Sequence, residues 1–246
     1  MTAVFDQIAS EYDRIWTRSA VGHLQREAVW RHVGDLFKPG QSVLDLGCGT
    51  GEDALRLMQA GLRVRAIDAS PEMVRIARDR GVDAQTLSIE KCGLLDDTFD
   101  AVLSNFGPLN CVEDLDALCV PLARLIRPGG YLMICTMGHF CAWETAWALL
   151  RGQPRKAFRR WRKSVMASLG VRVFYPSKQR LEAAFRPAFT LANWYGIGLL
   201  VPPSYVTALS DGLLQELDAL DRRIAHWPVL RGSADHRLFV FTRNSS

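Results

Sequence analysis

The chain has 246 residues, of which 48% are hydrophobic and 23% are charged, a balance typical of a globular protein with a sizeable buried core. Its first segment carries acidic residues early and lacks an apolar run, which argues against a secretory signal, and no stretch approaches the roughly 20 apolar residues of a membrane-spanning helix. We therefore expect a cytoplasmic protein.

Cysteine usage gives no sign of a metal site or of disulfide bonds. The six cysteines lie mostly in apolar segments, as Cys135 does in YLMICTM. None forms a CxxC pair, and no Cys/His group has the spacing of zinc ligands. We expect reduced thiols in the core and no structural metal.

The chain opens with two predicted helices. Apolar side chains recur at helical spacing in the first of them: Phe5, Ile8, Tyr12, Ile15 and Trp16. A second helix is expected over 23–37, where Pro39 and Gly40 end it.

From residue 42 onward, short apolar runs alternate with helical patterns. Strands are expected over 42–46, 63–67, 84–87, 101–104 and 131–136, with helices over 52–60, 72–80 and 115–125. This alternation predicts parallel βαβ units with helices on both faces of one sheet. Further elements are expected near the end: helices over 178–185 and 204–226, and strands over 189–195 and 236–242.

A basic segment interrupts the alternation after the fifth strand. Residues 145–181 hold ten basic residues and no acidic one, although the whole chain carries only +4. Phe158, Trp161, Val165 and Leu169 fall near helical spacing among these cations, which predicts an amphipathic cationic helix within an insertion or lid over 137–175.

Three interpretations of this insertion remain open. It could be a solvated basic face packed on the acidic body, or it could contact an anionic membrane or a lipid-like substrate. Nucleic-acid binding is the least favoured, because no RNA-binding module accompanies the patch.

A glycine-rich turn follows the first strand. In SVLDLGCGTG, Gly47, Gly49 and Gly51 alternate, so the backbone can bend sharply and lie against a ligand. Amide groups at the start of the next helix then face that ligand. Asp68 ends the second strand, where its carboxylate can accept hydrogen bonds from ribose hydroxyls.

The residue after this turn separates two classes of cofactor. A dinucleotide-binding motif has glycine at that position, whereas this chain has Glu52, whose charge would repel a pyrophosphate. S-adenosylmethionine carries no phosphate, and Asp45 could face its cationic methionyl end. The pattern therefore favours S-adenosylmethionine over a dinucleotide.

Four ordered motifs carry a family resemblance: VLDLGCGTGEDA (43–54), RAIDAS (65–70), LDDTFDAVLSNFG (95–107) and LIRPGGYLMI (125–134). Together they resemble the class I S-adenosylmethionine-dependent methyltransferases, above all the small-molecule group with the ubiquinone/menaquinone and biotin-precursor enzymes. The resemblance covers about residues 1–136. It implies one domain over 1–246 with a helical cap over 1–37. It also implies a Rossmann-like, doubly wound, seven-stranded sheet whose last strand is antiparallel.

The resemblance also implies which residues hold the cofactor. Those expected at the methionine moiety are Asp45, Gly47, Cys48, Gly49 and Gly51. Asp68 would hold the ribose, while Ala69 and Met73 would pack on the adenine. The remaining expected contacts are Tyr12 in the cap, Ser88 and Ile89 after the third strand, and Asn105 and Phe106 near the sulfonium. Ser88 departs from the family, which commonly has an acid there.

Methyl transfer from a sulfonium mainly requires that the acceptor be held in line with the methyl group. A general base is needed only if the acceptor must lose a proton. Candidates at the carboxyl edge of the sheet are His139, Glu144 and His236. We predict methyl transfer to a small, hydrophobic or lipid-like acceptor; the alternative is a catalytically silent module that binds S-adenosylmethionine as a sensor or partner.

Overall fold

The computed structural model describes residues 2–167, 170–206, 209–225 and 227–245. Leu169 and His226, which the sequence analysis assigned to helices, lie outside the described residues. In these ranges no helix is both long and apolar enough to cross a membrane.

The two N-terminal helices are confirmed. Helix α1 (Thr2–Tyr12) continues into a π-helical turn (Asp13–Thr17), and α2 (Ala20–Val33) follows. Helix α2 begins earlier than predicted because Ser19 caps it: the Ser19 hydroxyl accepts a hydrogen bond of 3.0 Å from the Gly22 N–H.

The alternating middle of the chain is also confirmed. Its strands are β1 (Ser42–Leu46), β2 (Arg63–Asp68), β3 (Asp83–Thr86), β4 (Phe99–Ser104) and β5 (Ile126–Met137). Its helices are α3 (Glu52–Gln59), α4 (Pro71–Asp79) and α5 (Cys119–Leu125). The last third adds α8 (Lys178–Phe185), β8 (Phe189–Ile197), α9 (Asp211–Ile224) and β9 (His236–Arg243).

The cationic helix predicted through Phe158 and Val165 is wrong. The segment instead forms α6 (Ala142–Leu150), the short α7 (Pro154–Ala157), a 3₁₀ turn (Arg159–Trp161) and a hairpin of β6 (Ser164–Met166) and β7 (Arg172–Phe174). Tertiary ion pairs override the helical spacing, because the Arg160 side chain is drawn into a buried cluster of carboxylates.

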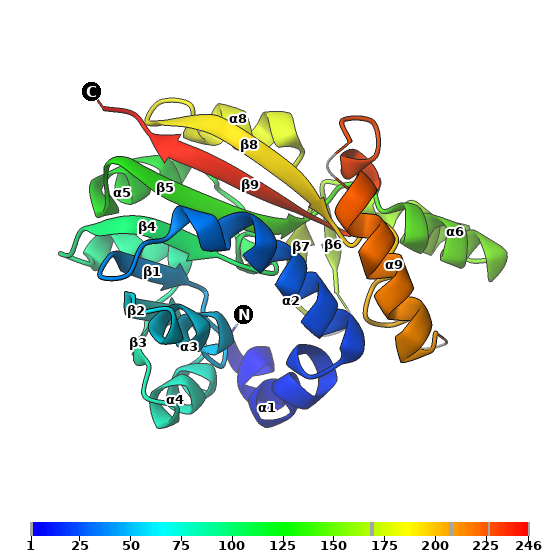
Figure 1. Cartoon of the computed structure of the whole chain (residues 1–246), viewed down its shortest axis with the longest axis horizontal. Helices are drawn as coiled ribbons and strands as arrows, with labels where there is room; N and C mark the ends of the chain where they lie inside the picture. The colour runs from blue at the N-terminus through cyan, green and yellow to red at the C-terminus, as the bar shows by residue number, and fades with distance from the viewer. Residues whose placement is uncertain (1, 168–169, 207–208, 226, 246) are drawn as a thin grey trace.

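The seven-stranded sheet has the order β3-β2-β1-β4-β5-β9-β8. Strands β1 to β5 pair in parallel, whereas β9 runs antiparallel to both β5 and β8, as predicted. The strand order reverses between β1 and β4, which places a crevice at their carboxyl ends. Helices flank the sheet on both sides; the second half of α2 packs with α3 on one face, and α1 contacts α4 (Figure 1).

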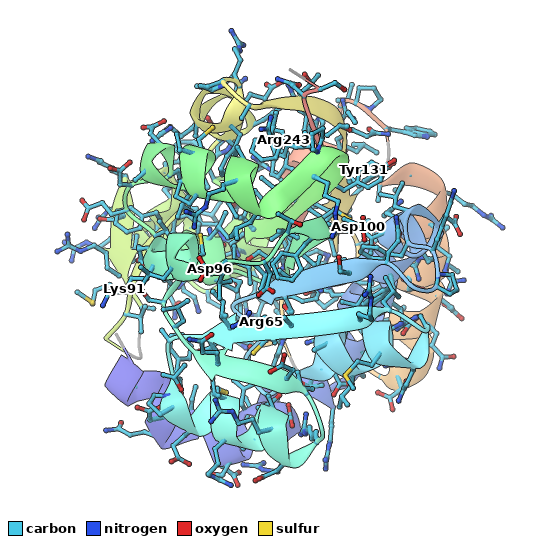
Figure 2. The ribbon with its side chains drawn as sticks, turned by 90° about the vertical axis from the view of Figure 1, so that its left-hand side faces the viewer. Arg65, Lys91, Asp96, Asp100, Tyr131 and Arg243 are labelled. Atoms are coloured by element: carbon cyan, nitrogen blue, oxygen red, sulfur yellow. The ribbon has the colours of Figure 1, made fainter. Side chains whose placement is uncertain are left out.

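Strand alternation divides the core between the two faces. In β1, Leu44 and Leu46 pack on the side of α5 and α8, together with Leu122 and Phe185. Val43 packs on the other side with residues of α2 and α3. Figure 2 views the edge opposite the crevice, where Asp100 lies near the start of β4, Tyr131 of β5 lies close by and Arg243 ends β9. Because both faces of the sheet are covered by apolar packing, a ligand site has to lie at an edge, and the crevice lies at the carboxyl ends of β1 and β4.

Candidate functional site

A cavity of about 300 Å³ lies at the carboxyl ends of β1, β2 and β4, under the N-terminal helix. We call it the inner cavity. Its lining includes most of the residues expected to hold a cofactor: Tyr12, Gly47, Cys48, Gly49, Asp68, Ala69, Met73, Ile89, Asn105 and Phe106. The topology of the sheet therefore brings these separate segments together.

The three glycines of the turn have different surroundings, although all have positive φ. A Cβ on Gly47 would lie 2.4 Å from Pro108, and one on Gly51 would lie 3.0 Å from Ala77 of α4. Gly51 thus serves packing and does not line the inner cavity. A Cβ on Gly49 would meet nothing within 4 Å, so this side of the turn is open to a ligand.

Asp68 connects the end of β2 to the glycine turn. Its carboxylate accepts hydrogen bonds of 2.9 Å from the Gly49 N–H and of 2.9 Å from the Ser70 N–H. Burial raises the pKa of Asp68, and these two N–H groups oppose that rise by favouring the ionised form. Asp68 both fixes the turn and lines the inner cavity.

Two aspartates fasten the N-terminal cap to the body. Asp13 accepts a hydrogen bond of 2.7 Å from Thr50 in the glycine turn and forms an ion pair with Arg80 after α4. Asp6 accepts hydrogen bonds from the Ser70 hydroxyl and the Glu72 N–H. Between them lies Tyr12, which lines the inner cavity and whose pKa burial raises to about 12, so its phenol is neutral near pH 7.

A buried network on the opposite wall was missed by the sequence analysis. Arg26 of α2 pairs with Asp53 of α3, which also accepts hydrogen bonds of 2.9 Å from Trp30 and 3.0 Å from Asn105. The Arg26 guanidinium lies 5.3 Å from the centre of the Phe106 ring. The signal was present, because Arg26 shares the buried stripe of α2 with Val29 and Trp30.

Asp45 and Ser88 do not line the inner cavity. Asp45 alternates with Leu44 and so faces α3, where it is 2% exposed and one of its oxygens has no hydrogen-bond partner in the described chain. Burial, followed by the nearby charge of Asp53, raises its pKa well above the usual range. Glu90 lines the cavity where Ser88 was expected.

The charges around the inner cavity suit a cationic ligand. Among the described residues, its lining contains a single guanidinium, that of Arg26, and four carboxylates, those of Glu52, Asp53, Asp68 and Glu90. A diphosphate would be repelled by this set, whereas a sulfonium and an ammonium group would be attracted. Arg26 is the one lining cation that could face a carboxylate. The residues present therefore fit S-adenosylmethionine.

The two histidines proposed as general bases lie outside the inner cavity lining. His236 packs against Phe106 with ring centres 5.3 Å apart, and its Nδ1 lies 3.3 Å from Asp235. His139 lines a separate cleft, and its Nδ1 lies 2.8 Å from the Arg237 guanidinium. Burial and the charge of Arg237 lower the pKa of His139, which favours a neutral ring.

Glu144, the third candidate base, belongs to a buried ion cluster. It is 1% exposed and accepts hydrogen bonds of 2.6 Å from Arg159, 2.9 Å from Arg160 and 2.9 Å from the Tyr205 hydroxyl. Burial opposes its ionisation, but the two arginines hold its pKa below the usual range. These contacts give Glu144 a place in the folding of the insertion, away from the inner cavity.

Comparison with known proteins adds independent evidence. A family model described as a methyltransferase domain matches residues 44–134. The demethylmenaquinone methyltransferase of Mycolicibacterium paratuberculosis is 34% identical over 207 residues, which cover 80% of this chain and 86% of that protein. The enzyme of the same name from Clavibacter sepedonicus is 36% identical over 147 residues, which cover 55% of this chain and only 57% of the relative.

A solved structure shares the fold. The S-adenosylmethionine-dependent methyltransferase from Mesorhizobium loti superposes with a TM-score of 0.60 at 17% identity, covering 87% of this chain and 97% of that chain.

The Asp68→Ala variant should bind S-adenosylmethionine and its demethylated product roughly 10- to 100-fold more weakly, because charge-assisted hydrogen bonds contribute about 1.5–3 kcal/mol each. Isothermal titration calorimetry measures the change. Asp83→Ala, at the opposite end of neighbouring β3, is the matched control and should bind like the wild type. Unchanged affinity of Asp68→Ala would remove the ribose assignment.

The Glu144→Gln variant should lose about 3–5 kcal/mol of unfolding free energy, because it leaves buried arginines short of counter-charge. Urea denaturation measures this loss. The folded state lowers the pKa of Glu144. The difference in unfolding free energy between the wild type and Glu144→Gln should therefore be largest above the unfolded-state pKa, and it should shrink as the pH falls through the lower folded-state pKa. Glu182→Gln, which breaks the part-exposed pair with Lys178, should change stability by less than about 1 kcal/mol. Unaltered stability of Glu144→Gln with abolished catalysis would instead favour the general-base role.

Proposed function

Because this chain belongs to the class I S-adenosylmethionine-dependent methyltransferases, of the demethylmenaquinone methyltransferase type, we propose that it transfers a methyl group from S-adenosylmethionine to a small, lipid-like acceptor. The observation that carries this proposal is the acidic inner cavity at the carboxyl ends of β1 and β2, with its single guanidinium. The names of the relatives support the lipid-like class of acceptor.

Residues of the inner cavity would hold the cofactor by charge and hydrogen bonding. Asp68 would accept hydrogen bonds from the ribose, and Arg26 would face the methionine carboxylate. Gly49 leaves the backbone open to close approach, and Met73 and Ile89 offer apolar contact for the adenine. Tyr12, Asn105 and Phe106 would enclose the reacting end.

The chemistry asks little of the protein beyond alignment. S-adenosylmethionine supplies a methyl group that is already activated by its sulfonium. The chain therefore needs to orient the acceptor and to exclude water, and the cap held by Asp6 and Asp13 serves the second need. The inner cavity wall formed by Val112, Met137 and Val173 is apolar, which suits an acceptor with an apolar body. The proposal requires no general base from His139, Glu144 or His236.

The same proposal includes the division of the chain. Residues 1–37 act as a cap and residues 137–175 as a lid on a methyltransferase domain that spans 1–246. We place the protein in the cytoplasm.

Methyl-labelled S-adenosylmethionine tests the activity directly. With demethylated quinol lipids as acceptors, the wild type should produce a labelled lipid, and Asp68→Ala should produce at least tenfold less at a subsaturating cofactor concentration. Calorimetry with S-adenosylmethionine and NAD in parallel checks that only the former binds. Cofactor binding without any labelled product, across these lipids and a broad lipid extract, would favour the silent sensor or partner module.

We also propose that the insertion touches anionic membranes, where a lipid-like acceptor would be found. Several apolar side chains of this segment are strongly exposed, among them Leu150 at 84%, Trp161 at 64% and Met166 at 60%. The exposed cations Arg155, Arg162 and Lys163 accompany them. Exposed aromatic and basic side chains together are typical of surfaces that lie in the membrane interface.

Sedimentation with vesicles tests this contact. Replacing Arg155, Arg162 and Lys163 by Gln should lower the partition coefficient onto phosphatidylglycerol vesicles roughly 100-fold, because each of the three charges near the surface contributes about 1 kcal/mol. The matched control replaces the exposed cations Lys38, Arg186 and Arg223, which lie outside the insertion. If the wild type does not sediment with these vesicles, the membrane proposal is wrong.

A further inference from the structure

A second hollow of about 940 Å³ adjoins the inner cavity, and we call it the outer cleft. The two share Val112, and strand β7 forms part of the wall between them: Val173 lines the inner cavity and Phe174 lines the outer cleft. Asn110 fixes this wall, since its side chain donates a hydrogen bond of 2.6 Å to the Phe174 carbonyl and accepts one of 2.8 Å from the Met137 N–H.

The outer cleft is strongly basic. The described residues that line it include one carboxylate, that of the exposed Glu113, and six cations: Arg160, Arg162, Lys163, Lys178, Arg180 and Arg237. Three of these cations have carboxylate partners, with Lys178 paired to Glu182 and Arg180 to Asp116, while Arg160 joins the Glu144 cluster. Arg162 and Lys163 are exposed on the rim and form no ion pair within the described ranges.

Arg237, at the floor of the outer cleft, is the most informative of them. It is 2% exposed, yet its guanidinium contacts no carboxylate in the part of the chain that the structure describes. It donates to His139 Nδ1 and to the Gly232 carbonyl, and its Nε–H has no partner among the described atoms. Burial and the neighbouring charge of Arg160 lower its pKa to about 10, so it remains charged near pH 7.

Two buried acids in this part of the fold, Glu144 and Asp235, are already engaged by other cations. Glu144 pairs with Arg159 and Arg160, and Asp235 pairs with Arg160 and lies beside His236. A buried charge that lacks a counter-ion is strongly unfavourable, and buried charges in proteins are normally paired with a group of opposite charge. The charge of Arg237 in the outer cleft therefore has no counter-ion among the described residues.

His139 adds a second donor beside Arg237. An arginine can only donate, so His139 Nδ1 must accept, and the neutral ring carries its proton on Nε2. The pair thus presents N–H groups from a guanidinium and an imidazole. Gly138 makes room for this arrangement, because a Cβ there would lie 2.7 Å from Arg237 Nε.

Aromatic side chains form other parts of the outer cleft: Phe140, Trp161, Phe174, Tyr175 and Trp194. Such walls bind the apolar part of a ligand, while the cations bind its charged group. The number of cations favours a dianion over a monoanion.

We infer that the outer cleft binds a phosphate ester with an apolar body, its phosphate at Arg237 and His139 and its apolar part against the aromatic walls. The phosphate site stands on Arg237, on the neighbouring His139 donor and on the other cations of the outer cleft, and it does not depend on the proposed methyl transfer.

Binding of matched ligands tests the phosphate site. The full chain, saturated with S-adenosylhomocysteine, is titrated with geranyl phosphate, geraniol and inorganic phosphate by isothermal titration calorimetry. Geranyl phosphate should bind at least tenfold tighter than geraniol. Equal affinity of the phosphate and the alcohol would overturn the inference.

Variants locate the site. Arg237→Met and Gly138→Ala, which crowds Arg237, should each weaken geranyl phosphate binding at least tenfold while leaving geraniol binding unchanged. Because Arg237 is buried, the exposed double change Arg162→Gln with Lys163→Gln serves as a variant that keeps the fold, and it should weaken binding severalfold. Arg223→Gln, an exposed cation on α9, is the control. Wild-type affinity in all three cleft variants would overturn the site.

The source of the phosphate is distinguished by competition. Capture by phosphatidic acid vesicles that geranyl phosphate reverses would identify a lipid headgroup, whereas binding of geranyl phosphate without vesicle capture would identify a soluble ester. Both results support the phosphate site. If the protein binds neither geranyl phosphate nor phosphatidic acid vesicles, the phosphate site is wrong. Intact phosphate and cofactor binding without methyl transfer would sink the proposed function but not the phosphate site.

Discussion

The hydrogen bond from the Gly49 N–H to the Asp68 carboxylate is the contact on which the site depends. It joins the turn after β1 to the end of β2, so two loops from neighbouring strands act as one surface. The same carboxylate accepts a hydrogen bond from the N–H of Ser70, the residue that caps α4, and the Ser70 hydroxyl donates to Asp6 of the cap. One buried acid therefore links the sheet, a helix and the segment that covers the cavity.

Short sequence patterns were enough to predict the strands and turns whose structure depends on neighbouring residues. The bounds of β1 follow from a short apolar run, and the open side of Gly49 and the position of Asp68 follow from where the strands end. The alternation of β1 could also have shown that Asp45 faces α3, since Leu44 and Leu46 already occupy the other face. That signal was in the sequence and was not used.

Features made by distant contacts could not be predicted in the same way. The buried stripe of α2 could have shown that Arg26 is buried, but nothing near Arg26 or Asp53 in the sequence identifies the other as its partner, because they meet only when α2 packs beside α3. The predicted helix through Phe158 failed because Arg160 binds Glu144 and Asp235, so buried charge pairing decided the backbone where periodicity suggested otherwise. Arg237 gives no sign in the sequence that its charge is left uncompensated, because that depends on which acids other cations reach first.

The antiparallel direction of β9 has a practical meaning for anyone who handles this protein. Its first residues, His236 and Arg237, lie at the ligand-binding edge, so the strand leads away from it and ends at Arg243 beside Phe189. The C-terminus accordingly emerges on the far side, away from α1 (Figure 1). An affinity tag or a surface tether attached there would leave both hollows accessible, whereas one on the N-terminus would hang from the cap itself.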